Sequence, residues 1–270
     1  MKKNKNNQTQ KNKPDSQPET AYSDRYHSNR DQSSQNNTEV EISICFPAFN
    51  EERNIGFTVA DALRVMNPLH RTYEILVVND GSQDGTTSIV ENLVSQHPQV
   101  RLHHHLQNQG YAITTRTCLE QARGKLIFVI DSDRQHDLGD IPLFLEAMAQ
   151  GYDLSIGWKK NRQDSFSRVW LAKGYNFIFR WMFGSSLHDV DCGFRCLTRE
   201  AAGKIAIGYE KVPVGPEIVA RALHQRMKIT EIVVRHYPPN GKSTLKVSPR
   251  KILTILQGFS NLRQELSLKK

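Results

Sequence analysis

The chain has 270 residues, with 36 lysines and arginines against 28 aspartates and glutamates, and so a formal net charge of +8. This length allows one large domain or two small ones, and no uninterrupted apolar run reaches the roughly 18 residues of a membrane-spanning helix. The positive balance suits an anionic partner such as a nucleotide, a lipid phosphate or a nucleic acid, although a surplus of this size is most often only a solvated surface.

The first 38 residues differ in composition from the rest. Asn, Gln, Lys and Ser dominate them, and such a segment buries too little apolar surface to offset the entropy of ordering. They lack the apolar segment of a secretory signal and are neither rich in arginine nor free of acids, which argues against a secretory signal and a transit peptide. We predict a disordered polar tail over residues 1–38.

The cysteines point to a reducing compartment. Cys45, Cys118, Cys192 and Cys196 lie mainly in apolar surroundings and lack the paired CxxC spacing of a zinc site. We therefore expect buried, reduced thiols in a cytoplasmic protein.

After the tail, apolar strands alternate with helical patterns. We expect strands at residues 41–47, 73–78, 100–106 and 125–130, and helices at residues 51–66, 83–96 and 111–123. This alternation predicts an α/β protein with a mainly parallel central sheet flanked by helices. In such sheets ligands bind at the carboxyl ends of the strands.

A polar cluster follows each of these four strands. The clusters are PAFNE (47–51), NDGS (79–82), NQG (108–110) and DSD (131–133). Since the carboxyl ends of parallel strands share one edge, we expect a nucleotide site there. Asp131 and Asp133 would share a face of extended backbone, and two anions so close repel each other unless a cation lies between them.

The second half is less regular. We expect strands at residues 153–157, 192–197 and 228–237, an aromatic-rich helix at 166–183, a helix at 216–226 and a basic amphipathic helix from 249. We predict one domain over residues 39–248, followed by this C-terminal helix over 249–270.

Spacing argues against three other phosphate motifs. The glycines of NDGSQDG (79–85) lie four apart and do not form GxGxxG. GKST (241–244) ends like a P-loop, but His236 stands where the first glycine is needed. Asp131-x-Asp133 also suggests an aspartyl phosphatase of the haloacid dehalogenase type, yet Gln135 replaces the expected Thr or Val and three strands precede it.

An Asp-x-Asp that holds a divalent metal fits better. Mg²⁺ or Mn²⁺ takes hard oxygen ligands from carboxylates and from a diphosphate, and so turns their repulsion into a bridge. A lone DxD is a weak signal, because such pairs are common in turns and helix caps. The four loops at one edge strengthen it.

Five segments stand out in order along the chain: PAFNEE (47–52), VVNDGSQDGT (77–86), NQGYA (108–112), DSDRQHDLGDI (131–141) and DCGFRCLTREA (191–201). Together they resemble the family 2 glycosyltransferases, and especially the branch of dolichyl-phosphate mannosyltransferase and the polyprenyl-phosphate sugar synthases. The resemblance covers roughly residues 41–245. It implies a nucleotide-diphospho-sugar transferase (GT-A type) fold and an inverting transfer from a UDP- or GDP-sugar, with Mg²⁺ or Mn²⁺ and without a nucleic-acid partner.

The resemblance also implies roles for single residues. Those implied to bind the nucleotide or sugar are Pro47, Phe49, Glu51, Val78, Asp80, Asp131, Ser132 and Lys159, with Phe49 where tyrosine is usual. Those implied to bind the metal are Asp133 and Gln135, and those implied in catalysis are Asp133, Asp189, Asp191 and Arg168.

Structural explanations compete with some of these roles. Asp80 and Ser82 could cap the helix expected from Gln83, and Glu51 could be a first-turn acid that complements the helix dipole. The triplet His103-His104-His105 suggests a metal cluster, but alternation along a strand would divide it between two faces.

The acceptor decides which side chains the reaction needs. An alcohol needs a carboxylate base, for which Asp189, Asp191 and Glu217 are candidates. A lipid phosphate is already anionic and needs basic residues around it, and Arg168, Arg195, Lys242 and Lys246 are available. The aromatic helix and the basic C-terminal helix could then contact an anionic membrane surface from the cytoplasmic side.

Two departures weaken the case for a lipid acceptor. The polyprenyl-phosphate branch often has an arginine three residues before the glycine near position 241 and a lysine after the following serine, where this chain has Pro238 and Thr244. We favour a lipid-phosphate acceptor over a saccharide or other hydroxyl acceptor. A catalytically silent domain that binds a sugar nucleotide is a further alternative.

Overall fold

The structure is a computed structural model that describes residues 39–160, 166–208, 212–238 and 249–268. Residues 39–270 form one compact unit. The predicted tail, Lys242 and Lys246 lie outside the described residues.

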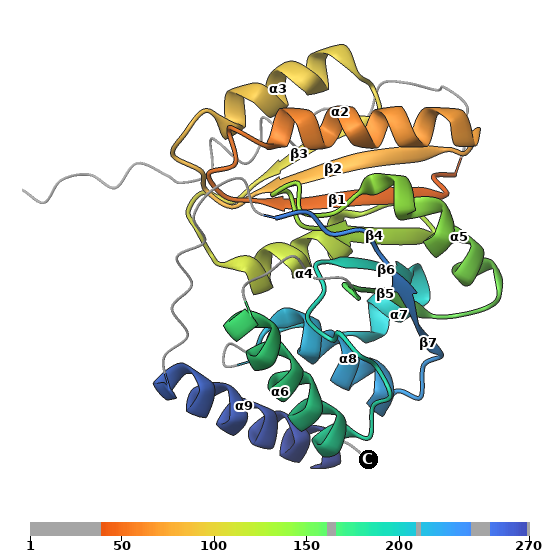
Figure 1. Ribbon diagram of the computed structural model, residues 1–270. Helices are drawn as coiled ribbons and strands as arrows, with labels where there is room; N and C mark the ends of the chain where they lie inside the picture. The colour runs from red at the N-terminus through yellow and green to blue at the C-terminus, as the bar shows by residue number, and fades with distance from the viewer. Residues whose placement is uncertain (1–38, 161–165, 209–211, 239–248, 269–270) are drawn as a thin grey trace, which may run out of the picture. The chain divides into compact units, whose positions relative to one another are not determined.

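Among the described residues, a seven-stranded sheet forms the centre of this unit (Figure 1). Its strands are β1 (Ile42–Ala48), β2 (Tyr73–Asn79), β3 (Val100–His104), β4 (Leu126–Ile130), β5 (Leu154–Trp158), β6 (Phe194–Thr198) and β7 (Ile229–Val233), in the spatial order β3-β2-β1-β4-β6-β5-β7. Only β6 runs antiparallel to its neighbours. The prediction of a mainly parallel sheet is confirmed, because β1 to β4 are parallel and their carboxyl ends meet at one edge.

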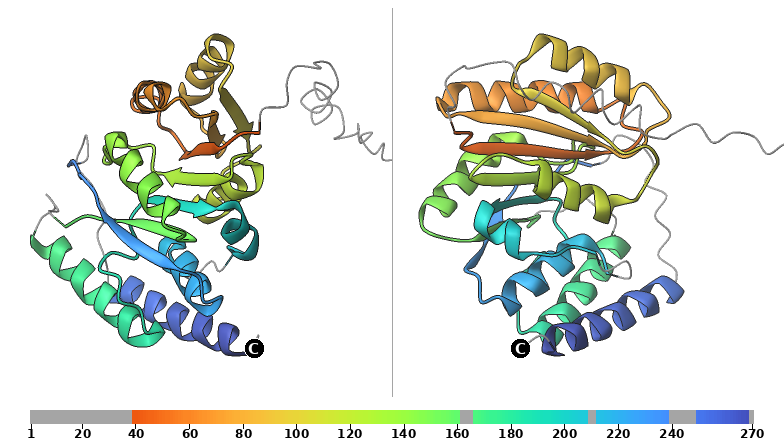
Figure 2. Two further views of the ribbon diagram at one scale, coloured as in Figure 1. Left: turned by 90° about the vertical axis from the view of Figure 1, so that its right-hand side faces the viewer. Right: turned by 180° about the vertical axis from the view of Figure 1, so that it is seen from behind.

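Helices cover both faces of the sheet (Figure 2). One face carries α2 (Ile55–Met66), α3 (Thr86–Gln96) and α5 (Ile141–Ala149), and the other carries α4 (Tyr111–Gln121), α7 (Arg199–Lys204) and α8 (Val214–His224). The central strands read as continuous apolar runs because both of their faces are buried. In β1, Ile44 and Phe46 pack into one core cluster and Cys45 into the other.

Two further helices complete the second half. They are α6 (Phe166–Phe183) and α9 (Pro249–Leu268), and they pack together through Tyr175, Phe179 and Phe183 against Phe259. Within the described part of the chain, no helix is long and apolar enough to cross a membrane.

The sequence prediction missed four short elements: η1 (Asn67–Leu69), η2 (Leu138–Asp140), α5 and α7. It also began α2 and α3 too early, because the loops before these helices bind each other. The Asn50 amide N–H donates to Ser82 Oγ at 2.9 Å and the Gln83 amide N–H donates to Asn50 Oδ1 at 2.9 Å. These bonds hold both chain segments in loop conformation until Ile55 and Thr86.

The competing structural roles are wrong. Gly85, not Asp80 or Ser82, precedes the first turn of α3, and no acidic residue lies in the first turn of α2.

Candidate active site at the carboxyl edge of the sheet

A pocket of about 490 Å³ opens where β1, β2 and β4 end. Its lining comes from the end of β1, from the loops after β1 to β4, from α4 and from the segment around β6: Pro47, Ala48, Phe49, Glu51, Asp80, Asn108, Tyr111, Thr114, Asp131, Ser132, Asp133, Asp191 and Arg195. Five carboxylates and a single arginine therefore share this space.

Asp80 fixes one wall of the pocket. Its Oδ1 accepts hydrogen bonds from the Gln109 amide at 2.9 Å and from His105 Nδ1 at 2.7 Å, and its Oδ2 accepts one from the Gly110 amide at 2.8 Å. Burial favours the neutral acid, but these hydrogen bonds outweigh it and lower the pKa of Asp80. Asp80 is thus an ionised carboxylate in a fixed position.

His105 in turn hydrogen-bonds within this wall, and its ring also contacts that of His103 edge to face, with the centroids 5.7 Å apart. Its Nε2 lies 3.0 Å from Thr117 Oγ1. Within the part of the chain that the structure describes, no group of three or more His, Cys, Asp or Glu side chains could hold a metal by itself.

Ser132 ties the loop after β4 to its neighbours. Its hydroxyl donates to the Pro47 carbonyl at 2.9 Å, and its own carbonyl accepts from Thr58 Oγ1 at 3.1 Å. The side chain is buried. These contacts therefore fix the loop after β4 to the end of β1 and to α2.

Asp131 lies between the two halves of the sheet. Its Oδ1 accepts a hydrogen bond from Tyr111 Oη at 2.5 Å, and its amide donates to the Gly193 carbonyl at 3.0 Å. A Cβ at residue 193 would come within 1.7 Å of Asp131 Oδ2, so only glycine leaves room for this carboxylate.

Arg195 is a buried cation beside the acids. Its side chain is 1% exposed, and its Nε and Nη1 have no hydrogen-bond partner among the described residues. Burial disfavours its charge, but Tyr111, Asp131 and Asp191 outweigh this effect and raise the pKa of Arg195. A permanently charged guanidinium therefore faces the pocket with donors to spare.

Asp133 and Gln135 face each other across a tight turn. The Gln135 amide donates to Asp133 Oδ1 at 3.0 Å, and the Gln135 side chain also contacts Asp133 Oδ2. Arg134 between them has φ +62°, a left-handed conformation that is uncommon for a residue with a side chain. This turn brings the side chains of Asp133 and Gln135 together beyond the end of β4.

The acids raise one another's pKa. Burial and the charge of Asp131 raise the pKa of Asp133, against the hydrogen bonds from Gln135. Burial, with the charges of Asp133, Asp84 and Asp131, also raises the pKa of Glu51. Such a cluster favours either a proton or a cation among its members.

The two candidate bases after α6 lie in different surroundings. Asp189 is buried, does not line the pocket, and has Oδ2 at 3.6 Å from Lys159 Nζ. Asp191 faces the pocket. Desolvation by the surrounding protein raises the pKa of Asp191 to about 6, although Arg195 and Lys159 act in the opposite direction.

The other predicted residues are more distant. Val78 is fully buried in the core, and Glu217 is buried and paired with Arg221 at 2.8 Å. Gln135 contacts Asp133, and Lys159 lies beside Asp189. Neither Gln135 nor Lys159 is part of the lining. The side chain of Arg168 lies outside the described residues.

Sequence reasoning gave no individual role to four residues of the lining: Ala48, Asn108, Tyr111 and Thr114. The segment NQGYA contains Asn108 and Tyr111, and it follows a strand and opens α4. Only the fold shows that the Tyr111 hydroxyl reaches Asp131.

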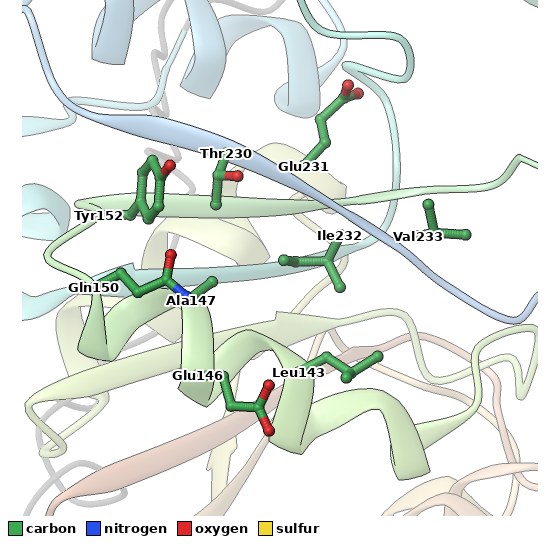
Figure 3. Close-up of a pocket in the computed structure, with 9 residues that line it drawn as sticks. All are labelled: Leu143, Glu146, Ala147, Gln150, Tyr152, Thr230, Glu231, Ile232 and Val233. Atoms are coloured by element: carbon green, nitrogen blue, oxygen red, sulfur yellow. The ribbon is translucent and has the colours of Figure 1, made fainter.

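A second pocket, of about 370 Å³, lies between α5 and the edge strand β7 (Figure 3). Leu143, Ala147, Tyr152 and Ile232 contribute to its lining, and Glu231 points away from α5. It contains none of the predicted site residues. The chemistry is concentrated at the carboxyl edge.

Comparison with known proteins agrees with this geometry. The family model of Glycosyl transferase family 2 matches residues 43–205. The undecaprenyl-phosphate 4-deoxy-4-formamido-L-arabinose transferase of Aeromonas hydrophila subsp. hydrophila is 30% identical over 169 residues, which are 61% of this chain and 51% of that protein. The dolichyl-phosphate beta-glucosyltransferase of Drosophila melanogaster is 27% identical over 218 residues, 73% of this chain and 67% of that protein. The chain spans about half of the length of the Aeromonas relative.

Solved structures share the fold. Glucosyl-3-phosphoglycerate synthase from Mycobacterium tuberculosis, in complex with Mn²⁺, UDP and glucosyl-3-phosphoglycerate, has a TM-score of 0.61 at 18% identity over 84% of this chain and 80% of that one. A mannosyltransferase from Pyrobaculum calidifontis, in complex with GDP-Man and Mn²⁺, has a TM-score of 0.59 at 15% identity over 82% of this chain and 69% of that one. These similarities confirm the expected GT-A type fold.

Proposed function

This chain belongs to glycosyl transferase family 2, and we propose that it transfers a sugar with inversion from a UDP- or GDP-sugar to the phosphate of a polyprenyl lipid. The observation that carries the proposal is the pocket in which the acidic loops of β1, β2 and β4 meet the buried Arg195. Such a pocket suits a ligand that brings both a cation and phosphate groups.

Asp133 and Gln135 would hold Mg²⁺ or Mn²⁺ in this scheme. Their oxygen atoms are hard ligands. Burial, and then the neighbouring charge of Asp131, raise the pKa of Asp133, and a bound cation would offset both effects. Since these two residues are too few to enclose an ion, phosphate oxygens and water would complete the set, as is usual for Mg²⁺. The bound ion would act as a Lewis acid on the leaving nucleoside diphosphate.

The first half of the sheet would bind the nucleotide. Asp80 is an ionised acceptor in a fixed position and suits the N–H groups that uracil and guanine present. Phe49 is 43% exposed at the mouth and offers a face for stacking. We assign Pro47 and Glu51 to the base and ribose, and Asp131 to the ribose or the sugar hydroxyls.

The second half of the sheet would bind the acceptor. A lipid phosphate is an anionic nucleophile and needs no base, but it needs a cation to bring it to the acids. Arg195 has two nitrogens without a partner among the described residues, which supports an anionic ligand there. We retain Arg168 as a further phosphate contact.

One face of α6 suits a membrane surface. Phe177 and Trp181 are 63% and 77% exposed, and Lys173 and Arg180 lie on the same side at helical spacing. The helix has no acidic residue. Exposed aromatic rings beside cations are typical of helices that lie in the interface of anionic bilayers, so we propose a peripheral position on the cytoplasmic membrane face.

The relatives support a lipid acceptor, because their names include undecaprenyl phosphate and dolichyl phosphate. A hydroxyl acceptor is the second candidate, and Asp191 favours it. This carboxyl faces the pocket with a pKa of about 6, and a general base works best when its pKa is near the working pH.

The experiment incubates the purified chain with radiolabelled UDP- and GDP-sugars, Mn²⁺ and undecaprenyl phosphate in detergent. We expect label in the organic phase with one donor and none when undecaprenol replaces its phosphate. Label that stays in water would reject the lipid acceptor, and binding of the nucleotide without turnover with any candidate acceptor would indicate the silent binding domain.

A further inference from the structure

The segment that follows β7 lies along the loop that carries Asp133 and Gln135. We name residues 234–238 the strap. The Tyr237 amide donates to the Gln135 carbonyl at 2.9 Å, and residues 136 and 236 form an isolated antiparallel bridge. The strap is thus joined through its backbone to a proposed metal ligand.

A single arginine of the strap clamps the far end of this loop. Arg235 Nη2 and Nε lie 2.7 Å and 2.9 Å from Asp140 Oδ1, and its amide donates to Asp140 Oδ2 at 2.8 Å. Arg235 Nη1 lies 2.8 Å from Asp137 Oδ2. Charge-assisted bonds from a planar guanidinium are strong and fix direction as well as distance.

The two aspartates of the clamp also organise the loop itself. Asp137 Oδ1 accepts from the Gly139 amide at 2.9 Å and so caps η2, and Asp137 Oδ2 accepts from Tyr237 Oη at 3.0 Å. Asp140 is buried at the start of α5. The loop is therefore held by β4 at one end and by Arg235 at the other.

Between these ends lies the left-handed turn at Arg134. Such a conformation is unfavourable for a residue with a side chain, and it persists only where surrounding contacts hold it. This turn sets the relative position of Asp133 and Gln135. Loss of the clamp would release the turn without removing either side chain.

We propose that Arg235 is a positioning residue for the divalent cation: through Asp137 and Asp140 it holds Asp133 and Gln135 in the arrangement that binds the ion. The inference rests on the proposed function, in which these two residues hold the ion. Partners that orient metal ligands typically change metal affinity about 10- to 100-fold. Arg235 does not line the nucleotide pocket, so its effect falls on the cation.

The test measures thermal unfolding at a fixed concentration of UDP, or of GDP if UDP does not bind, while Mn²⁺ is varied. We expect Arg235→Met to raise the Mn²⁺ concentration for half-maximal stabilisation about 10- to 100-fold. Arg235→Lys keeps the positive charge but loses the planar guanidinium that contacts both aspartates. It should raise this Mn²⁺ concentration less than Arg235→Met does. Nucleotide affinity at saturating Mn²⁺ should stay close to the wild-type value.

Arg71→Met is the matched control, because its ion pair with Glu41 is exposed and lies at the opposite edge of the sheet, before β1 and β2 begin. It should leave the Mn²⁺ dependence unchanged. Asp140→Asn removes the charge at the other end of the clamp and should reproduce the shift, which keeps the test possible if Arg235→Met does not fold.

Two results would overturn the inference: an unchanged Mn²⁺ requirement in the clamp variants, or an equal loss of nucleotide affinity at saturating Mn²⁺. Failure of the proposed function has a different signature, since the wild-type chain would then show no Mn²⁺-dependent stabilisation by either nucleotide.

Discussion

The two halves of the sheet differ in how they satisfy their polar groups. From residue 39 to Asp133, the Thr115 hydroxyl is the single described buried side-chain polar atom without a hydrogen bond. In the second half, the described atoms that lack one include Arg195 Nε and Nη1, His136 Nδ1, Asp189 Oδ2 and the Tyr175 hydroxyl. An unsatisfied buried polar group costs about 1–3 kcal/mol. Of these residues Arg195 lines the pocket, so a ligand there could satisfy it, whereas the first half is preorganised.

Replacement of Arg195 should have the largest effect on activity, because it removes the cation whose two nitrogens without a described partner distinguish the second half. Arg195→Met removes the cation that faces the pocket, and loss of one preorganised charged donor typically lowers a rate about 10²- to 10³-fold. We expect sugar transfer to fall by this factor while UDP or GDP affinity in Mn²⁺ stays near the wild-type value. Steady-state kinetics and calorimetry measure the two quantities.

Arg195→Lys is the control for charge alone and should retain part of the activity. Transfer at the wild-type rate in the Met variant would contradict the assignment. An equal loss of nucleotide affinity would show that Arg195 binds the sugar-nucleotide donor and not the acceptor.

The exposed face of α6 allows a test of the proposed membrane contact in the second half of the chain. A Phe177→Ser and Trp181→Ser double variant removes two large apolar side chains, each worth about 1.5–3 kcal/mol when fully buried. With partial insertion we expect at least about tenfold weaker partitioning. Co-sedimentation with vesicles of phosphatidylcholine and phosphatidylglycerol measures it.

Leu143→Ser provides the control, since Leu143 is 43% exposed on α5. If the double variant and this control bound the vesicles equally well, the proposed contact of α6 with the membrane would be wrong.

The smallest expected effect concerns stability. Because the pKa of Asp191 is raised to about 6, the folded chain keeps this proton after the unfolded chain has lost it, and the free energy of unfolding falls as pH rises from about 4 to about 6. Asp191→Asn cannot ionise, and should be more stable than the wild type above pH 6 by about 1 kcal/mol, after allowance for screening at a pocket-facing group.

Urea unfolding at pH 4 and pH 7 measures this difference. If the free energy of unfolding changed with pH in the same way in both proteins, the pKa of Asp191 would not be raised by folding. The contrast between the two halves would then be weaker.

The local pattern of apolar and polar residues predicted the strands of the first half of the molecule well. Apolar runs that end in polar clusters located β1 to β4, and topology then placed Asp80, Asp131 and Asp133 at one edge. The boundaries of α2 and α3 were wrong, because bonds between Asn50 and Ser82 connect loops that are distant in sequence.

The second half depended more on contacts that no local pattern encodes. Asp189 and Asp191 are two residues apart, yet one pairs with Lys159 and the other faces the pocket. Arg235 and Asp140 are 95 residues apart. Only the assembled sheet brings such pairs together.

The central claim is that the acidic edge binds a nucleoside diphosphate through a divalent cation. Calorimetric titration of the chain with UDP and with GDP, in Mn²⁺ and again in EDTA, tests it most directly, with Asp133→Asn as the variant. The account predicts that one nucleotide binds in Mn²⁺, and that EDTA or the substitution abolishes this binding. Equally tight binding in EDTA, or binding that Asp133→Asn leaves intact, would contradict it.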